Sequence, residues 1–187
     1  MSELRRDELS GRWVLLAPDR AARPKTFVDR SETPQARRAC PFCPGNERET
    51  PPEVARTGEG VPDTPGWRVR VVPNLYPIVG GTDGGGGAHE VLIFTPDHNH
   101  SFGYLSDDEA AEAVTVLRDR VRHHLGEGCA YVQAAINHGP AAGASIEHPH
   151  AQVIALDFVP PAVSAALERV ASAGDDLVAT AAAAAPG

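Results

Sequence analysis

Two cysteines three positions apart are the first residues whose spacing suggests chemistry. Cys40 and Cys43 form a C-x-x-C knuckle at the centre of the segment CPFCPGNE. This spacing allows two thiolates to bind one metal ion from a single tight turn, and zinc commonly takes four Cys and His ligands. A redox role is the alternative, but the surrounding residues are not those of a thioredoxin-like motif. Because no secretion signal is recognisable, we expect reduced thiols and a cytoplasmic location.

Histidines elsewhere in the chain are candidates for the remaining two ligands. His98 follows the apolar run VLIF and the turn TPD, and His148 begins the segment HPHAQ, so both are expected at strand ends. The third cysteine, Cys129, lies inside an apolar segment and is a poorer candidate. We therefore predict that both histidines join the two thiols in a zinc site, with His100 as the rival of His98.

The segment HPHAQ carries a second set of polar side chains, which could act on phosphorus. In an extended strand, residues two apart face the same side, so His148, His150 and Gln152 point together. An imidazole can attack phosphorus and form a covalent phosphoramidate that a second substrate then cleaves. One histidine would then serve the metal and one the substrate. The alternative is that all three side chains only make structural hydrogen bonds.

Two further segments contain groups suited to phosphate binding. The turn NHGPAAGAS over 137–145 is rich in Gly and Ala, so its backbone N–H groups can approach a phosphate, and Asn137 and Ser145 add side-chain donors. Arg20 and Arg23, three apart in the turn PDRAARP, suit a diphosphate. Each of these residues also has a simpler interpretation as a turn former or as part of the solvated surface.

Short strands and one long helix must position these residues. Ser106 and Glu109 form a capping box, and apolar residues at helical spacing predict a helix over 106–125. The segment 29–66 is rich in Pro, Gly and charge and is expected to form the loop that carries the two cysteines. Apolar or alternating segments predict strands over 11–17, 67–72, 88–95, 129–137 and 148–158. The predicted fold class is therefore α+β.

The domain organisation follows from the same pattern. Residues 1–160 contain all the predicted strands and the long helix, so we expect them to form one domain. Pro160 and Pro161 open a last helix that runs to about residue 170, and the sequence continues into the alanine-rich ATAAAAAPG. We therefore separate residues 161–187 as a C-terminal helix and tail.

Composition and charge exclude several classes of protein. The 187 residues include 17 Lys and Arg against 25 Asp and Glu, with a formal net charge of −8, and 42% are hydrophobic. These values are typical of an ordinary globular domain. A broad nucleic-acid surface needs clustered cations, and a membrane span needs about 20 apolar residues. We expect neither a nucleic acid nor a membrane as partner.

Taken together, these motifs resemble the galactose-1-phosphate uridylyltransferase family, a transferase branch of the histidine-triad superfamily. The matching stretches are GRWVLLAPDRAARP (11–24), CPFCPGNE (40–47), RVVPNLYPIV (70–79), HEVLIFTPDH (89–98) and NHGPAAGASIEHPHAQVIA (137–155). Their order and spacing agree with the first half of the family. The resemblance implies a histidine-triad-like nucleotidylyltransferase domain with a mainly antiparallel sheet, one long helix and a zinc-bearing N-terminal loop.

The resemblance also implies a role for each matching residue. His150 matches the nucleophile that takes the uridylyl group, and Gln152 matches the glutamine that hydrogen-bonds the phosphoryl group. Asn74 lies in the segment that helps to hold the uridine nucleotide. The family's structural zinc ligands match Cys40, Cys43, His98 and His148. Positions that line the nucleotide phosphates match Arg20, Arg23, Asn137 and Ser145.

The implied reaction is a ping-pong transfer of UMP from UDP-glucose to galactose 1-phosphate through a uridylyl-histidine. Hydrolase branches of the superfamily carry a third histidine where Gln152 stands. A glutamine cannot deliver a proton as an imidazolium can, so this difference is expected to protect the covalent intermediate from water. The ending HPHAQVIALDFVPP also resembles relatives that transfer adenylyl groups, including ADP-glucose phosphorylase, which leaves an adenylyltransferase as the alternative.

A third interpretation concerns the length of the chain. Members of the family are about twice this length and have a second, related domain. The chain could therefore be a zinc- and nucleotide-binding half-subunit that is catalytically incomplete alone. The expected partners are a UDP-sugar and a sugar 1-phosphate, together with a second copy of the chain or a separate second-half domain.

Overall fold

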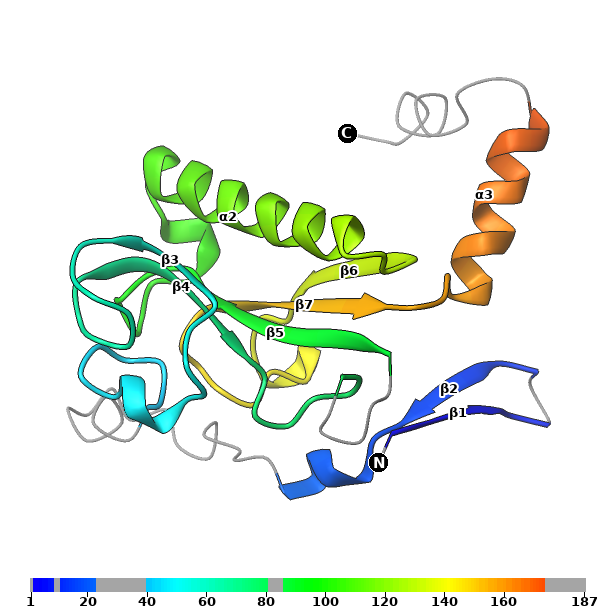
Figure 1. The fold of residues 1–187 in the computed structure, drawn as a ribbon, viewed down its shortest axis with the longest axis horizontal. Coiled ribbons are helices and arrows are strands. Elements are labelled where there is room, and N and C mark those ends of the chain that lie inside the picture. Colours follow the sequence, from blue (N-terminus) through cyan, green and yellow to red (C-terminus); the bar gives the residue numbers. More distant parts are fainter. Residues whose placement is uncertain (1, 9–10, 23–39, 81–85, 174–187) are drawn as a thin grey trace. The chain divides into compact units, whose positions relative to one another are not determined.

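The protein is described here by a computed structural model that covers residues 2–8, 11–22, 40–80 and 86–173 (Figure 1). Arg23, part of the predicted 29–66 loop and the alanine-rich tail lie outside these ranges. The chain divides into two compact units, residues 1–157 and 158–187, which are described separately. The domain boundary expected at residue 160 stays a prediction.

A five-stranded antiparallel sheet forms the centre of the first unit. Its strands follow the order β3-β4-β5-β7-β6. They are β3 (Ala55–Gly58), β4 (Trp67–Pro73), β5 (Gly87–Ile93), β6 (Tyr131–Ile136) and β7 (His150–Leu156). The α+β class, with a mainly antiparallel sheet and one long helix, is therefore confirmed.

The strand β3 differs from the sequence prediction, since it lies within the segment 29–66 that we expected to be loop. Its residues ARTG show no apolar alternation, so no period-two signal was available. Pairing with β4, in which Ala55 lies opposite Val71, supplies its backbone partners. The strand therefore depends on contact with a neighbour rather than on its own sequence.

The helix α2 (Asp107–Gly126) covers one face of the sheet (Figure 1). It begins at the predicted capping box: the Ser106 hydroxyl accepts from the Glu109 N–H, and the Glu109 carboxylate accepts from the Ser106 N–H at 2.9 Å. Ala113 is fully buried and packs in one cluster with Val71 and Leu92 of the sheet. Small and apolar side chains on one side of α2 therefore fix it to this face.

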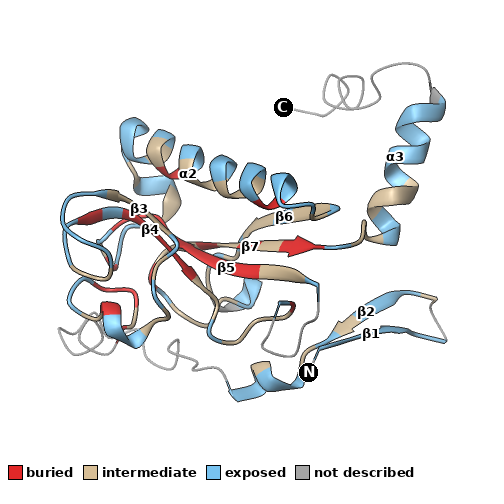
Figure 2. Ribbon diagram, in the orientation of Figure 1, coloured by how far each residue is buried: buried red, intermediate tan, exposed pale blue. Residues whose placement is uncertain are grey.

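The opposite face of the sheet carries the C-x-x-C segment and the candidate site. Because side chains alternate along a strand, Val72 and Val91 point away from α2 and pack in a second cluster with Phe42 and Trp67. The register pairs Val91 with Gln152, so the predicted functional residues of β7 lie on this same face. Figure 2 shows the buried residues concentrated on β4, β5 and β7.

The remaining elements are short. A separate hairpin is formed by β1 (Glu3–Arg6) and β2 (Trp13–Leu16), and the 3-10 turn η1 (Pro18–Ala22) follows it. Other 3-10 turns are η2 (Glu47–Glu49), η3 (Phe102–Tyr104) and η4 (Pro140–Ala142). The second unit contains α3 (Pro161–Ala173), which begins at the predicted proline.

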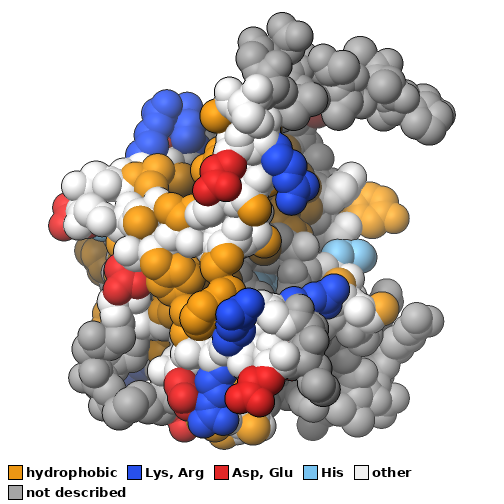
Figure 3. All heavy atoms as spheres, turned by 90° about the vertical axis from the view of Figure 1, so that its right-hand side faces the viewer, with side chains coloured by type: hydrophobic (Ala, Val, Ile, Leu, Met, Phe, Trp, Pro, Cys, Tyr) orange, Lys and Arg blue, Asp and Glu red, His pale blue; other side chains and the backbone are white. Residues whose placement is uncertain are grey.

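The apolar character of the helices and the distribution of surface charge bear on possible binding partners. Within the described ranges, no helix combines the length and the apolar character needed to cross a membrane. On the face drawn in Figure 3, the Lys and Arg side chains are scattered among acidic and hydrophobic ones.

Candidate active site and metal centre

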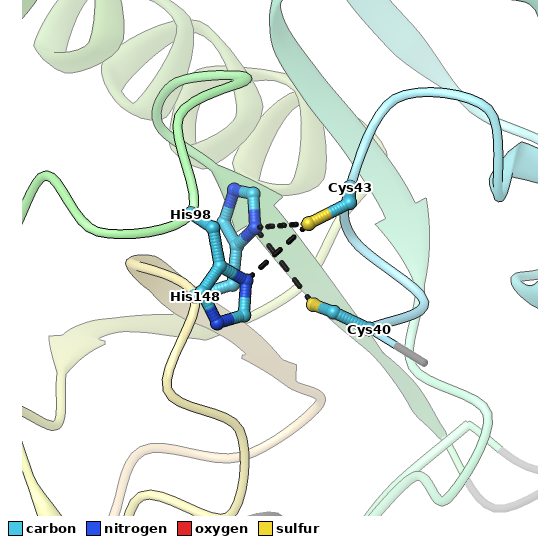
Figure 4. Close-up of side chains that lie close together, drawn as sticks. All are labelled: Cys40, Cys43, His98 and His148. Carbon is cyan, nitrogen blue, oxygen red and sulfur yellow. Dashed lines mark hydrogen bonds between the residues drawn. The ribbon is translucent and has the colours of Figure 1, made fainter. Parts of the chain in front are cut away.

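Four buried side chains from three separate segments converge on one point (Figure 4). They are Cys40, Cys43, His98 and His148, and one donor atom from each lies within 4.8 Å of all the others. The Cys43 Sγ atom is 3.3 Å from His98 Nδ1 and 3.6 Å from His148 Nδ1. A tetrahedral ion with bonds of about 2.0–2.3 Å separates its ligands by about 3.3–3.8 Å. The donor set and its spacing therefore fit a four-coordinate zinc ion.

The structure also distinguishes the two histidines between which the sequence left a choice. His98 is buried and points its Nδ1 atom at Cys43. The side chain of His100 is about half exposed, and its Nε2 atom lies 3.8 Å from the Asp97 carboxylate. His98 is thus the histidine that the fold brings to the cluster.

Local hydrogen bonds hold the ligand atoms in place. In the knuckle, the Cys40 carbonyl accepts from the Cys43 N–H at 3.2 Å and from the Asn46 side-chain amide at 2.8 Å. The His148 Nε2 atom lies 2.8 Å from the carbonyl oxygen of Thr95, to which it must donate. This bond leaves the lone pair on Nδ1, the atom that faces the thiols, as is usual for a metal-binding histidine.

The charge state of the knuckle also suits a cation. A hydrogen bond from the Cys40 thiol lowers the pKa of Cys43 despite its burial. This shift favours the thiolate form of Cys43, which is the form that binds metal.

Glu47, which the sequence analysis missed, supports the knuckle from the outside. Its carboxylate is buried and accepts from the Gly45 N–H and from the Trp67 indole N–H, each at 3.0 Å. These bonds connect the knuckle to β4. The only signal in the sequence was an acidic residue shortly after the second cysteine.

Beside the metal cluster lies a cavity of about 560 Å³, which is in the size range of small-molecule sites. The cavity is lined by the predicted catalytic residues His150 and Gln152. Three residues predicted to bind the nucleotide also line it, namely Arg20, Asn74 and Ser145. Asn137 lies instead at a second cavity of about 310 Å³, which His150 also borders. Arg23 lies outside the described residues.

His150 is oriented by the backbone of the metal-cluster residue that precedes it by two positions. Its Nδ1 atom lies 2.8 Å from the carbonyl oxygen of His148, to which it must donate, so the lone pair of the neutral ring is on Nε2. Burial lowers the pKa of His150, which favours the neutral ring. Phe42 packs edge-on against the ring with centroids 5.3 Å apart. The imidazole is therefore held with one nitrogen available for chemistry.

His89, a second residue that the sequence analysis missed, contacts Gln152. The His89 Nε2 atom lies 2.9 Å from Gln152 Oε1, and its Nδ1 atom accepts from the Ile78 N–H at 3.1 Å. His89 is 4% exposed, and burial lowers its pKa to about 4. No pattern within the sequence of β5 indicated this contact, because it depends on the pairing of β5 with β7.

Arg20 reaches the cavity from the turn η1. Its Nη1 atom donates to the carbonyl oxygen of Tyr76 at 2.7 Å. Asn74 lies in the same loop, and its Oδ1 atom accepts from the Tyr76 N–H at 2.9 Å. Contacts with the Tyr76 backbone, in the loop after β4, therefore hold the Arg20 guanidinium and the Asn74 amide beside the cavity.

Comparison with known proteins shows which family this sequence is similar to. A family model described as the N-terminal domain of galactose-1-phosphate uridyl transferase matches residues 81–160. The galactose-1-phosphate uridylyltransferase of Haemophilus influenzae is 30% identical over 174 residues, which are 86% of this chain and 48% of that protein. The chain matches the galactose-1-phosphate uridylyltransferase family in the family's N-terminal domain. Its sequence resemblance to this family is therefore confirmed.

Another relative of this chain is named for a different activity. The ADP-glucose phosphorylase of Arabidopsis thaliana is 35% identical over 185 residues, which cover 89% of this chain and 52% of the relative. A crystal structure of an Arabidopsis ADP-glucose phosphorylase with bound ADP-glucose superposes with a TM-score of 0.61 at 32% identity, over 88% of this chain and 51% of that one. The α+β fold of this chain is thus shared with that relative. The chain spans about half the length of the curated relatives it matches.

Proposed function

We propose that this chain is a nucleotidylyltransferase domain that takes a nucleoside monophosphate from a nucleoside diphosphate sugar onto His150 and passes it to a sugar 1-phosphate. The observation that carries this proposal is the 2.8 Å contact between His150 Nδ1 and the His148 carbonyl. It leaves Nε2 as the free nucleophilic atom on a residue that lines a ligand-sized cavity.

The proposed transfer has two displacement steps at the α-phosphorus. In the first, the Nε2 lone pair forms an N–P bond while the bond to the bridging oxygen breaks, and the sugar 1-phosphate leaves with that electron pair. In the second, a phosphate oxygen of the acceptor attacks the same phosphorus and the N–P bond returns its electrons to Nε2. The His148 carbonyl, which accepts from Nδ1–H, stabilises the positive charge that the ring carries between the steps.

The residues around His150 have matching roles in this proposal. Gln152 and Ser145, which line the same cavity, would donate to the phosphoryl oxygens as charge develops on them. Arg20 would neutralise the diphosphate. Asn74 would contact the nucleoside from the loop after β4.

The metal site has a structural role in this proposal. A bound zinc ion would find all four positions taken by protein ligands, so it would have no open position for substrate or water. His148 would be held at the ion by its ring and would hold His150 by its carbonyl. The zinc ligands would therefore keep the nucleophile in register.

For the substrate, the first candidate is UMP transfer between UDP-glucose and galactose 1-phosphate, supported by the named uridylyltransferases. The second candidate is adenylyl transfer, favoured by the 35% identity to an ADP-glucose phosphorylase. We further propose that complete turnover requires a second domain in addition to the one described, since the chain spans about half the length of these relatives. Reduced zinc-binding thiols suit a cytoplasmic location.

Intact-mass spectrometry after incubation with UDP-glucose, and with ADP-glucose in parallel, tests the proposal. A mass gain of one UMP, absent in His150→Ala, is expected for the first candidate, and a gain of one AMP would assign the second. Retained zinc in the variant is the control for folding. No adduct with either sugar nucleotide, from folded and zinc-loaded protein, would overturn the proposed transfer.

A further inference from the structure

His89 is a buried polar residue on the cavity side of the sheet, and its ring contacts Asn74 and Gln152, which both line the cavity. It lies on β5 and is 4% exposed. One ring nitrogen faces the Ile78 N–H at 3.1 Å, and the other faces Gln152 Oε1 at 2.9 Å. A buried imidazole with both nitrogens engaged is costly unless each bond has the correct donor and acceptor.

The contacts of His89 determine which nitrogen carries the proton. A backbone N–H can only donate, so Nδ1 must be the unprotonated acceptor for Ile78. Burial keeps the ring neutral at pH 7, and its single proton is therefore on Nε2. The atom that faces Nε2 must then be an acceptor, and Gln152 meets this requirement only with its oxygen.

The other neighbour of Nε2 cannot replace Gln152 as acceptor. The Nδ2 atom of Asn74 is 3.2 Å away, but it is itself a donor. Reversing the Asn74 amide would turn its NH₂ group toward the Tyr76 N–H, from which the Asn74 oxygen accepts at 2.9 Å. The hydrogen on His89 Nε2 therefore goes to Gln152, and the Gln152 amide is fixed in one of its two orientations.

We propose that His89 is a positioning residue that fixes the side-chain amide of Gln152, so that Gln152 presents its N–H donors, and not its oxygen, to a phosphoryl group in the cavity. This inference rests on the proposed function of the cavity. With the amide reversed, a carbonyl oxygen would meet the anionic phosphoryl oxygens and repel them. Without His89 both orientations become available, and the donor is no longer preorganised.

Rates of single-turnover labelling of His150 test the proposal in four variants. Gln152→Ala is expected to slow labelling by about 100-fold, the usual effect of removing one such donor. His89→Leu is expected to slow it by about 10- to 100-fold, while the sugar-nucleotide concentration at half-maximal rate stays within about threefold, because the loss arises after binding. The double variant is expected to match Gln152→Ala, since a residue that acts through Gln152 has no effect without it.

Rescue by a conservative variant separates positioning from packing. His89→Gln can again donate from its Nε2 atom, so its labelling rate is expected to recover to within about fivefold of wild type. All variants are compared at equal zinc content and thermal midpoint. A further slowing of Gln152→Ala by His89→Leu, or no recovery in His89→Gln, would overturn the proposal.

A measurement without substrate keeps the result separate from the fate of the proposed function. Long-range ¹H–¹⁵N NMR of the zinc-loaded protein is expected to show His89 in the Nε2–H tautomer, and His89→Leu is expected to shift the Gln152 side-chain NH₂ signals. An Nδ1–H tautomer would overturn the positioning role whether or not the protein transfers nucleotides. Absence of labelling in the wild type would contradict the proposed function alone, and the tautomer would still decide the role of His89.

Discussion

The Nδ1 atom of His150 lies 2.8 Å from the carbonyl oxygen of His148, whose own Nδ1 atom faces the thiols of Cys40 and Cys43 at 3.8 and 3.6 Å. One residue therefore contributes its ring to the metal cluster and its backbone to the candidate nucleophile. A disturbance of the cluster moves the carbonyl that orients His150. Metal content and nucleophile reactivity are expected to be coupled through this single residue.

Loss of a thiol ligand is the first test of the cluster. Cys43→Ser is expected to reduce bound zinc from about one per chain to well below half, because a hydroxyl is a poor zinc ligand. For a metal present at about 1,000 times its Kd, the stability lost is about 4 kcal/mol, or about 8–16 °C in the thermal midpoint. Cys129→Ser, a cysteine outside the cluster, is the matched control, measured by metal analysis and thermal unfolding. A wild-type protein that folds without metal would contradict the prediction.

The choice between the two neighbouring histidines gives a second prediction. His98→Ala removes a buried cluster member and is expected to weaken zinc binding by at least about 10-fold. His100→Ala removes a half-exposed side chain and is expected to leave zinc affinity unchanged. Competition with a chromophoric chelator measures both. Equal zinc affinities in the two variants would exclude His98 as a ligand.

Arg20 gives a prediction for ligand binding. Measured by calorimetry in the His150→Ala background, where no transfer occurs, Arg20→Ala is expected to raise the Kd of the sugar nucleotide about 10- to 100-fold, because it removes a charge-assisted contact to the diphosphate. Arg118→Ala is the control, since Arg118 is exposed and paired with the adjacent Asp119. Similar affinities in both variants would remove Arg20 from the site.

Two arginines on β4 allow a matched test of stability. Arg70 is 1% exposed and pairs with Glu53 at 2.7 Å and with Asp63 at 2.8 Å. Arg70→Met removes the nearer of the two cations beside the buried Glu53 carboxylate, Arg56 lying 3.4 Å away, and is expected to lower the free energy of unfolding by about 3 kcal/mol. Arg68, two residues earlier, pairs with Glu112 at the exposed surface, so Arg68→Met is expected to leave the urea midpoint nearly unchanged. Equal midpoints for the two variants would show that the Arg70 network contributes no net stability.

The pKa of His89 predicts an acid-sensitive contribution to stability. Burial lowers this pKa to about 4, and the charges of Arg20 and Glu90 act on it in opposite directions. The unfolded chain, with a histidine pKa of about 6.5, therefore binds more protons between pH 6.5 and 4, and stability falls as the pH falls through this window.

This contribution can be isolated with the conservative variant. Between pH 7 and pH 5 the wild type is expected to lose about 2 kcal/mol more of its free energy of unfolding than His89→Gln. The reason is that the glutamine side chain at position 89 does not titrate. Urea unfolding of the zinc-loaded proteins at the two pH values measures the difference. A parallel loss in both proteins would show that His89 is not the acid-sensitive group.

The sequence predicted the parts of the site that depend on local pattern. Period-two spacing along HPHAQ placed His150 and Gln152 on one face of β7, and strand ends accounted for His98 and His148. Glu47 and His89 could not be predicted in the same way, because their roles depend on cross-strand and loop contacts that join residues far apart in the chain. Asn137 borders a different cavity, and the turn over 137–145 has no periodic pattern from which its orientation could be predicted.

The metal cluster also imposes an order on the maturation of the chain. His148 follows Cys43 by 105 positions, so the two thiols leave the ribosome long before their last partner is synthesised. At about 5–20 residues per second, this interval lasts about 5–20 s. During that time the knuckle holds an incomplete ligand set on a nascent chain, exposed to oxidation and to competing metals. The last ligand, His148, and the candidate nucleophile, His150, are synthesised only two positions apart. The ligand set is therefore completed at the same stage of synthesis at which the nucleophile becomes available.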